Sequence, residues 1–173
     1  MAKIVIIDDC VPFTKTLGFS YSGPEPLSIS KKMWEDMKTF FQVSTSGVAN
    51  SQLNWDDSGD PITYFERWWM KKDFNSFTRM TMKMKCIGSK KKTTDVGKFS
   101  TTFGSFIETT YSSPLPGPLA RLLWEIYSYL FYNKMRQRYL KQCTDMTLGY
   151  MEFVQKKFGM KTIAEDRQYS SGM

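Results

Sequence analysis

The clearest pattern in the chain is an alternation of apolar and polar positions over residues 79–86, within a segment that spans 77–87. The apolar members of this set carry sulfur, and they are Met80, Met82, Met84 and Cys86. Because successive side chains of a strand point to opposite faces, a period of two is typical of a strand that is buried on one side. The segment is therefore predicted to be a strand with a sulfur-rich face in the core and a charged face toward solvent.

Two neighbouring segments extend this strand into a sheet. Residues 98–111 alternate in the same way and follow an exposed turn. Residues 62–74 are ambiguous, because Asp60-Pro61 is typical of a helix start whereas the residues after it are aromatic and β-branched. We favour a strand over about 65–73, which gives a three-stranded antiparallel meander.

Helical periodicity dominates elsewhere. Apolar residues at i, i+3, i+4 and i+7 predict a helix that follows Ser30 as its N-cap. A broad apolar stripe predicts a long helix over 118–142. A second C-terminal helix is expected to start at Thr144 or Asp145 as its cap and to end at Gly159, because glycine is favoured just past a helix end.

These elements predict an α+β fold in which the three-stranded antiparallel meander packs against the long C-terminal helix pair and one N-terminal helix. Residues 3–7 are apolar and are expected to add an N-terminal strand, whereas 12–28 and 43–60 are rich in turn-forming residues and predict loops. The length predicts one domain, 1–163, followed by a polar tail, 164–173.

The composition narrows the cellular setting. No apolar run approaches the ~18 residues that a membrane span needs, and the first residues do not match a signal peptide. The three cysteines are far apart and include no CxxC pair, which disfavours both a disulfide framework and a zinc site. We therefore expect reduced thiols and a cytoplasmic location.

The net charge of +7 is distributed unevenly. By residue count it is −3 over 1–60 (5 cations, 8 anions), +6 over 61–111 (10 and 4) and +4 over 112–173 (9 and 5). Such an asymmetry favours a polyanionic partner, either a nucleic acid or an acidic surface of another protein.

Candidate catalytic chemistry is sparse. The chain has no histidine, which removes the commonest general base and metal ligand. A calcium loop starting at Asp56 fails because its sixth and twelfth positions hold Pro61 and Arg67 instead of Gly and Glu. Asp8-Asp9 lacks the alternating β and α units of a magnesium-binding receiver domain. We expect no metal, no cofactor and a binding role rather than an enzymatic one.

The solvent face of the meander gathers cations and one aromatic residue. The candidates for nucleic-acid binding on it are Arg67, Trp69, Lys71, Arg79, Lys83 and Lys85, extended at the hairpin by Lys90, Lys91 and Lys92. Cations neutralise phosphates and an aromatic ring stacks on a base, as single-strand binding requires. The alternative is a solvated face, because a one-sided antiparallel sheet must present polar residues to water and edge lysines deter aggregation.

The predicted long helix carries two further clusters. A second set of cations, partly explained by the helix dipole, comprises Lys134, Arg136, Arg138 and Lys141. The segment before it is aromatic on nearly every side and predicts a protein interface formed by Trp124, Tyr127, Tyr129, Phe131 and Tyr132.

Two functions follow from these patterns. The first is a non-enzymatic binding protein that contacts nucleic acid, acting within a ribonucleoprotein particle. The second is a structural subunit of an oligomer, filament or virus-like particle that uses the aromatic helix as its interface. A protein partner or self-association is expected in either case, and no membrane span.

Overall fold

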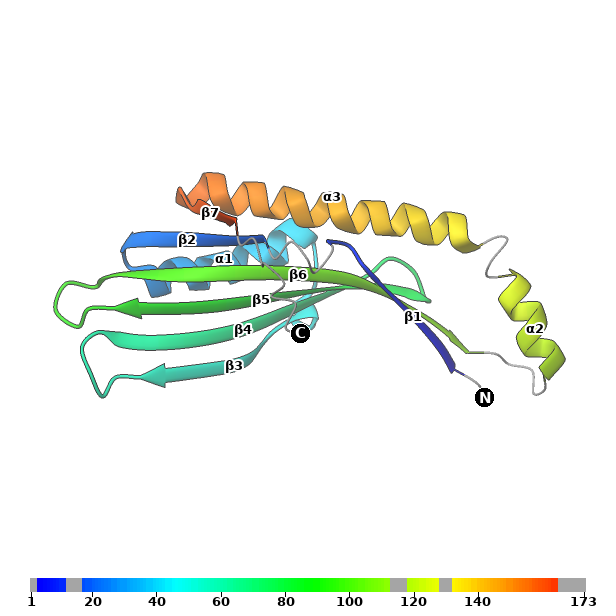
Figure 1. Cartoon of the computed structure of the whole chain (residues 1–173), viewed down its shortest axis with the longest axis horizontal. Helices are drawn as coiled ribbons and strands as arrows, with labels where there is room; N and C mark the ends of the chain where they lie inside the picture. Colours follow the sequence, from blue (N-terminus) through cyan, green and yellow to red (C-terminus); the bar gives the residue numbers. More distant parts are fainter. Residues whose placement is uncertain (1–2, 12–16, 113–117, 128–131, 165–173) are drawn as a thin grey trace, which may run out of the picture.

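The computed structural model describes residues 3–11, 17–112, 118–127 and 132–164. Within them the chain forms a seven-stranded antiparallel sheet, with two helices packed on one of its faces (Figure 1). The elements in chain order are β1 (Lys3–Asp9), β2 (Leu17–Pro24), α1 (Pro26–Phe41), the 3-10 turn η1 (Thr45–Gly47), β3 (Val48–Asp56), β4 (Ile62–Asp73), β5 (Thr78–Lys90), β6 (Val96–Ser112), α2 (Pro118–Tyr127), α3 (Asn133–Phe158) and β7 (Lys161–Ala164).

The strands follow the order β3-β4-β5-β6-β2-β7, and β1 also pairs with β6. The long strand β6 makes this possible, because β2 pairs with its first half and β1 with its second half. The middle of the sheet therefore consists of β4, β5 and β6, and β3 forms one edge.

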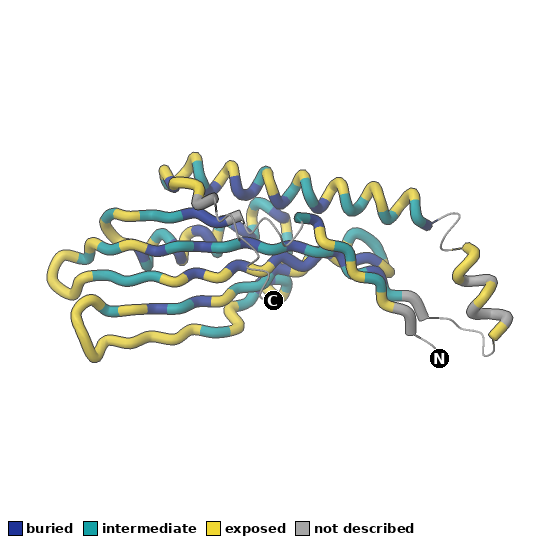
Figure 2. Tube along the Cα trace, viewed as in Figure 1, coloured by how far each residue is buried: buried dark blue, intermediate teal, exposed yellow. Residues whose placement is uncertain are grey.

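The prediction of a three-stranded meander packed on a helix pair is wrong, because the sheet is larger and dominates the fold. Its three middle strands contain the three segments that we predicted to form the meander. β2 and β3, in contrast, lie in segments that we predicted to be loops. β3 is exposed along most of its length (Figure 2) and so has no buried face to produce an apolar pattern. β2 is rich in Gly and Ser, which favoured a loop, but Phe19 and Tyr21 alternate with these residues and Phe19 is buried in the core.

The helices also differ from the prediction. α1 starts at Pro26, a residue suited to the first helical turn, and Ser30 lies buried inside it rather than capping it. α3 runs without interruption from Asn133 to Phe158, so the two C-terminal helices divide before residue 133 and not at Thr144. The Thr144 hydroxyl donates to the Leu140 carbonyl one turn earlier, as hydroxyls inside helices do.

Two predicted boundaries at the C-terminal end can be located. Gly159 ends α3 in the left-handed conformation, with φ at 63°, as predicted. Ala164, the first residue of the predicted tail, ends β7, and the remaining tail residues 165–173 lie outside the described residues.

The core lies between α1, α3 and one face of the sheet. The predicted sulfur-rich face of β5 is confirmed, since Met80, Met82, Met84 and Cys86 are all at most 1% exposed. α1 and α3 are joined by a buried hydrogen bond of 2.7 Å, which the Tyr150 hydroxyl donates to the Met33 carbonyl. The opposite face of the sheet, which we call the open face, is covered by neither helix.

A disulfide bond joins Cys10, just after β1, to Cys143 in α3, across a Cα–Cα distance of 5.6 Å. The expectation that all three cysteines are reduced is therefore wrong for this pair. Sequence spacing could not reveal the bond, because 133 residues separate its ends and only the folded sheet brings them together. Cys86 is a free and buried thiol.

Candidate nucleic-acid interface

The register of β4 and β5 places the predicted sheet cations on the open face. Arg67 is opposite Lys85, Trp69 is opposite Lys83, and Lys71 is opposite Thr81. The alternate residues of both strands form the buried methionine face, so these side chains point away from the core. The sequence thus placed its sheet candidates on one surface, and no described helix covers them.

Aromatic rings lie between these cations. The Arg67 guanidinium and the Lys85 ammonium lie 5.5 and 5.8 Å from the centre of the Phe65 ring. Lys71 lies 4.8 Å from Trp69, and Lys83 lies 5.2 Å from Phe106 on β6. We call this set the basic face, and it consists of Phe65, Arg67, Trp69, Lys71, Lys83, Lys85 and Phe106.

The electrostatics of the basic face are unfavourable for the protein alone. Arg67 and Lys85 are directly opposite each other, and like charges at such positions destabilise a sheet. Among the residues that the structure describes, neither of them, nor Lys71 or Lys83, is ion-paired with a carboxylate. An anion bound between the two strands would relieve this repulsion.

Arg79 lies on the same face but is already neutralised. Its Nε lies 2.5 Å from Asp73 Oδ1, and the hydrogen bond to this carboxylate raises the pKa of Arg79, with Glu108 adding a weaker attraction. Arg79 is therefore a poorer candidate for binding phosphate than its position in the sequence suggested.

The hairpin cations Lys90 and Lys92 are held by contacts within the protein. Lys90 forms a 2.6 Å ion pair with Asp95 in its own turn. The backbone N–H of Lys92 donates to Asp60 and its ammonium donates to the Asp57 carbonyl, which fastens the β5–β6 turn to the acidic β3–β4 turn. Lys91 lies exposed between them.

The helix cations form a separate surface. Lys134, Arg136, Arg138 and Lys141 lie on α3, which packs on the covered side of the sheet (Figure 1). Arg136 is also ion-paired, with its Nε 3.0 Å from Asp8 Oδ2. The structure thus does not bring the two predicted cation clusters together.

The predicted aromatic interface divides into different environments. Tyr132 is buried, and its hydroxyl hydrogen-bonds Thr78 at 2.6 Å and accepts from the Asn75 amide at 3.2 Å, so it belongs to the interior. Tyr127 is exposed on α2. Tyr129 and Phe131 lie outside the described residues, as does the side chain of Trp124.

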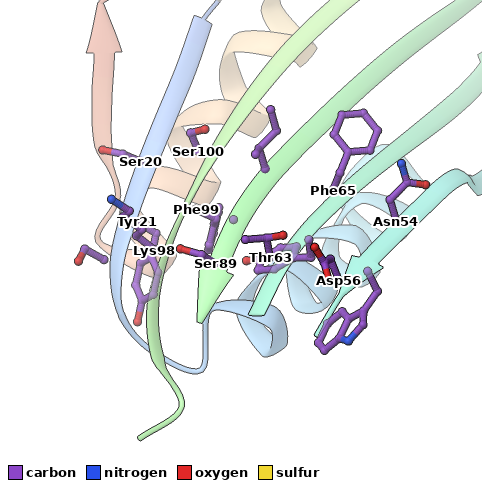
Figure 3. A pocket seen from close by; sticks show the side chains of 15 residues that line it. Ser20, Tyr21, Asn54, Asp56, Thr63, Phe65, Ser89, Lys98, Phe99 and Ser100 are labelled. Atoms are coloured by element: carbon purple, nitrogen blue, oxygen red, sulfur yellow. The ribbon is translucent and has the colours of Figure 1, made fainter. Parts of the chain in front are cut away.

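A groove of about 670 Å³ adjoins the basic face at the end of the sheet nearest the hairpins (Figure 3). Three consecutive residues from each of β2, β3, β4, β5 and β6 line it. By strand alternation the outer two of each three share the open face, and those side chains are Ser20, Ser22, Asn54, Asp56, Thr63, Phe65, Ile87, Ser89, Lys98 and Ser100.

The groove carries opposite charges at two of its strands. Lys98 lies on β6, and Asp56 lies on the edge strand β3. The Ser58 hydroxyl and backbone N–H donate to Asp56 Oδ1 at 2.6 and 3.0 Å, and these hydrogen bonds lower the pKa of Asp56. The Asp56 carboxylate is therefore ionised at neutral pH.

Sequence reasoning missed the groove and three members of its surroundings. Phe65 and Phe106 could have been found, because each alternates with core positions of its own strand and must therefore face outward. Lys98 could have been found in the same way. The groove itself could not be assembled from the sequence, since β2 and β3 were predicted to be loops.

A buried polar cluster lies on the covered face. The Ser30 hydroxyl and the Trp68 indole N–H both donate to Glu66 Oε2, at 2.6 and 3.0 Å. Burial raises the pKa of the nearby Cys86 thiol to about 12. The thiol is thus protonated at neutral pH and is not a nucleophile there.

No protein-family model and no curated protein matches this chain. No helix in the described ranges is long and apolar enough to cross a membrane. Across the same ranges, no three cysteine or acidic side chains gather in a way that could hold a metal ion.

Proposed function

We propose that this protein is a non-enzymatic binding protein whose basic face contacts single-stranded nucleic acid, within a ribonucleoprotein particle. The observation that carries the proposal is the arrangement of Arg67, Lys71, Lys83 and Lys85 around half-buried aromatic rings on an uncovered sheet face. Cations supply the salt-dependent attraction to phosphates, and rings supply stacking surfaces that every base can use.

An acidic protein surface is the competing partner for the same cations. The aromatic residues favour nucleic acid, because stacking of flat bases uses the rings whereas a carboxylate uses only the charges. The like-charge pair Arg67–Lys85 is also suited to a phosphate that bridges both side chains.

Charge reversal on the two faces of the protein tests this proposal. In a gel-shift titration with a single-stranded RNA, Lys83→Glu/Lys85→Glu should weaken binding by about 100-fold and reduce the salt slope by about 1.4, for two lost phosphate contacts. The matched control is Lys134→Glu/Lys141→Glu on α3, which changes the net charge equally and should weaken binding by no more than a few-fold. Equal losses in the two variants would show that only net charge matters and would contradict the proposal.

Self-assembly is the second candidate function, and one observation favours it. Leu122, Ile126 and Tyr127 are 53%, 48% and 49% exposed on α2, which lies beyond the start of α3 and covers neither face of the sheet (Figure 1). Leu122→Lys/Ile126→Lys should then reduce the mass measured by light scattering, and Leu148→Lys on α3 should not. A wild-type monomer at high concentration would contradict this candidate.

We also propose that the protein is located in the cytoplasm. Cytosolic thiols are held reduced, so this location requires the Cys10–Cys143 bond to be open in much of the protein in the cell. Mass spectrometry of protein from its native source, with thiols blocked at lysis, measures that fraction. A fully oxidised pair would contradict the proposed location.

A further inference from the structure

The groove is built from two complete rows of side chains that cross five strands of the open face. The first row, from β3 to β2, is Asn54, Phe65, Ile87, Ser100 and Ser20. The second row, one step nearer the hairpins, is Asp56, Thr63, Ser89, Lys98 and Ser22. Neither row has a described helix above it, so both are open to a ligand.

The first row lies directly beside the strongest like-charge pair of the basic face. Phe65 and Ile87 are each two residues along their strands from Arg67 and Lys85, a displacement of about 7 Å. A ligand seated over Phe65 and Ile87 thus has at its side two cations that are ion-paired with no carboxylate of the described ranges. The groove and the basic face are continuous, and Phe65 belongs to both.

We propose that this groove is a base-binding subsite, which takes unpaired bases of a single nucleic-acid strand whose phosphates lie on Arg67 and Lys85. This inference rests on the proposed function and specifies the form of its ligand. The groove volume of about 670 Å³ falls in the range of small-molecule sites, ~300–1,000 Å³, which is ample for a base with its sugar.

The groove chemistry fits a base better than it fits a charged or purely apolar group. Phe65 offers a ring for stacking, and Ile87, which is 48% exposed, offers an apolar surface to a base face. The surrounding side chains are hydroxyls and one amide, which both donate and accept hydrogen bonds and so can satisfy the edge of any base. Those side chains are Ser20, Ser22, Asn54, Thr63, Ser89 and Ser100.

The charges of the second row orient the strand. Asp56 is ionised and repels phosphate, whereas Lys98, three strands away, attracts it. The strand therefore continues from the phosphates on Arg67 and Lys85 toward Lys98, and the base edges point toward β3. A carboxylate on that side can accept a hydrogen bond from an exocyclic amino group of a base.

A duplex cannot use this subsite, because its bases are already paired and stacked. It can still place phosphates on the cations. The groove should therefore add affinity for single strands alone, and filling it should remove that added affinity without changing the electrostatic contribution that both forms share.

Ser100→Trp tests this inference, because it fills the first row with a neutral side chain that suits a strand. Fluorescence anisotropy is measured with a short labelled RNA, the DNA of the same sequence, and the blunt duplex of each. Ser100→Trp should weaken single-strand binding by about 10-fold, as loss of one stacked base predicts, and duplex binding by less than about twofold. Thr110→Trp, on the same strand and face but outside the groove, should leave both unchanged.

Ser20→Trp fills the same row from β2 and provides a second test if Ser100→Trp does not fold. Unchanged single-strand binding in a folded groove variant would overturn the subsite while leaving the proposed function intact. Equal weakening of single strand and duplex would also overturn it. Wild-type protein that binds neither form would overturn the proposed function and this inference together.

An acidic peptide is titrated in parallel to separate a protein ligand from a nucleic acid. If Ser100→Trp weakens peptide binding and leaves the oligonucleotides unaffected, the groove is a protein site and the inference is wrong. If Ser100→Trp weakens the binding of single-stranded RNA and of single-stranded DNA to the same extent, the subsite binds bases, as proposed. If neither the single-stranded RNA nor the single-stranded DNA loses affinity, the result contradicts the inference.

Discussion

The covered face and the open face of β4, β5 and β6 are formed by the same strands, but their side chains make different contacts. On the covered face, methionines such as Met82 are buried against α1 and α3. On the open face, cations such as Lys85 lie over aromatic rings and have no carboxylate partner in the described part of the chain. The first arrangement stabilises the fold, whereas the second leaves charge and ring surface accessible to a ligand.

A comparison among the cations is equally instructive. Lys90 and Arg136 are bound by aspartates, so they contribute to the net charge but little to an exposed positive surface. The net charge of +7 therefore does not say which cations a polyanion can reach, whereas the contacts of each cation do.

The largest effect expected from this comparison is on stability. Met82→Ala on the covered face should lower the free energy of unfolding by about 2–5 kcal/mol, because it leaves a cavity in the core. Lys85→Ala on the same strand should change it by less than about 0.5 kcal/mol, as exposed substitutions do. Urea unfolding measures both, and similar losses would contradict the assignment of the two faces.

Alkaline pH should also act through the covered face. Burial raises the pKa of Cys86 from 9.0 to about 12, so the folded state holds this proton while the unfolded state loses it. Stability from this group is fully present below pH 9 and is lost as the pH rises toward 12, at up to about 1.4 kcal/mol per pH unit. Cys86→Ala should make the measured decline shallower, and an unchanged slope would contradict the assigned burial effect.

Stacking on the open face should be separable from its charge. Trp69→Ala should weaken single-strand binding by about 1–3 kcal/mol, as the loss of one stacked base predicts, and leave the salt slope unchanged. Trp69→Phe keeps a ring at the same position and should recover most of the affinity. Anisotropy titrations at several salt concentrations measure both quantities, and a reduced slope in Trp69→Ala would mean that the ring acts by positioning Lys71.

The sequence predicted the two faces of β5 because alternation alone decides which side chains share a side. Given β4 as a strand, the same rule placed Arg67, Trp69 and Lys71 with Lys83 and Lys85. The extent of the sheet was not predictable in this way. β3 is an exposed edge strand without a buried face. β2 does alternate, because Leu17, Phe19 and Tyr21 are separated by small residues, but its Gly and Ser content favoured a loop.

The sequence also could not predict which cations are held by contacts within the protein and which are free to bind a ligand. Asp60, which accepts from the Lys92 backbone, is 32 residues away from it, and Asp8, the partner of Arg136 on α3, lies on β1 at the other end of the chain. The groove depends on five strands in register, two of which were predicted to be loops. Local patterns therefore predicted sidedness, and long-range pairing decided which charges and surfaces remained free.

The smallest effect expected concerns two cations of the same face that differ only in their partners. Lys71 lies over Trp69 and pairs with no carboxylate that the structure describes, whereas Arg79 is held by Asp73. Lys71→Ala should therefore weaken single-strand binding a few-fold and reduce the salt slope by about 0.7, the value for one phosphate contact on a single strand. Arg79→Ala should weaken binding by less than about twofold.

Asp73→Asn provides the decisive variant in this series. It removes the carboxylate that neutralises Arg79 without removing the cation, so binding should strengthen and the salt slope should rise. Arg79→Ala measured in the Asp73→Asn background should then cost about as much as Lys71→Ala. If Arg79 contributes more than Lys71 in the wild-type protein, the ion pair does not withhold its charge, and partner contacts would not decide which cations of this face bind phosphate.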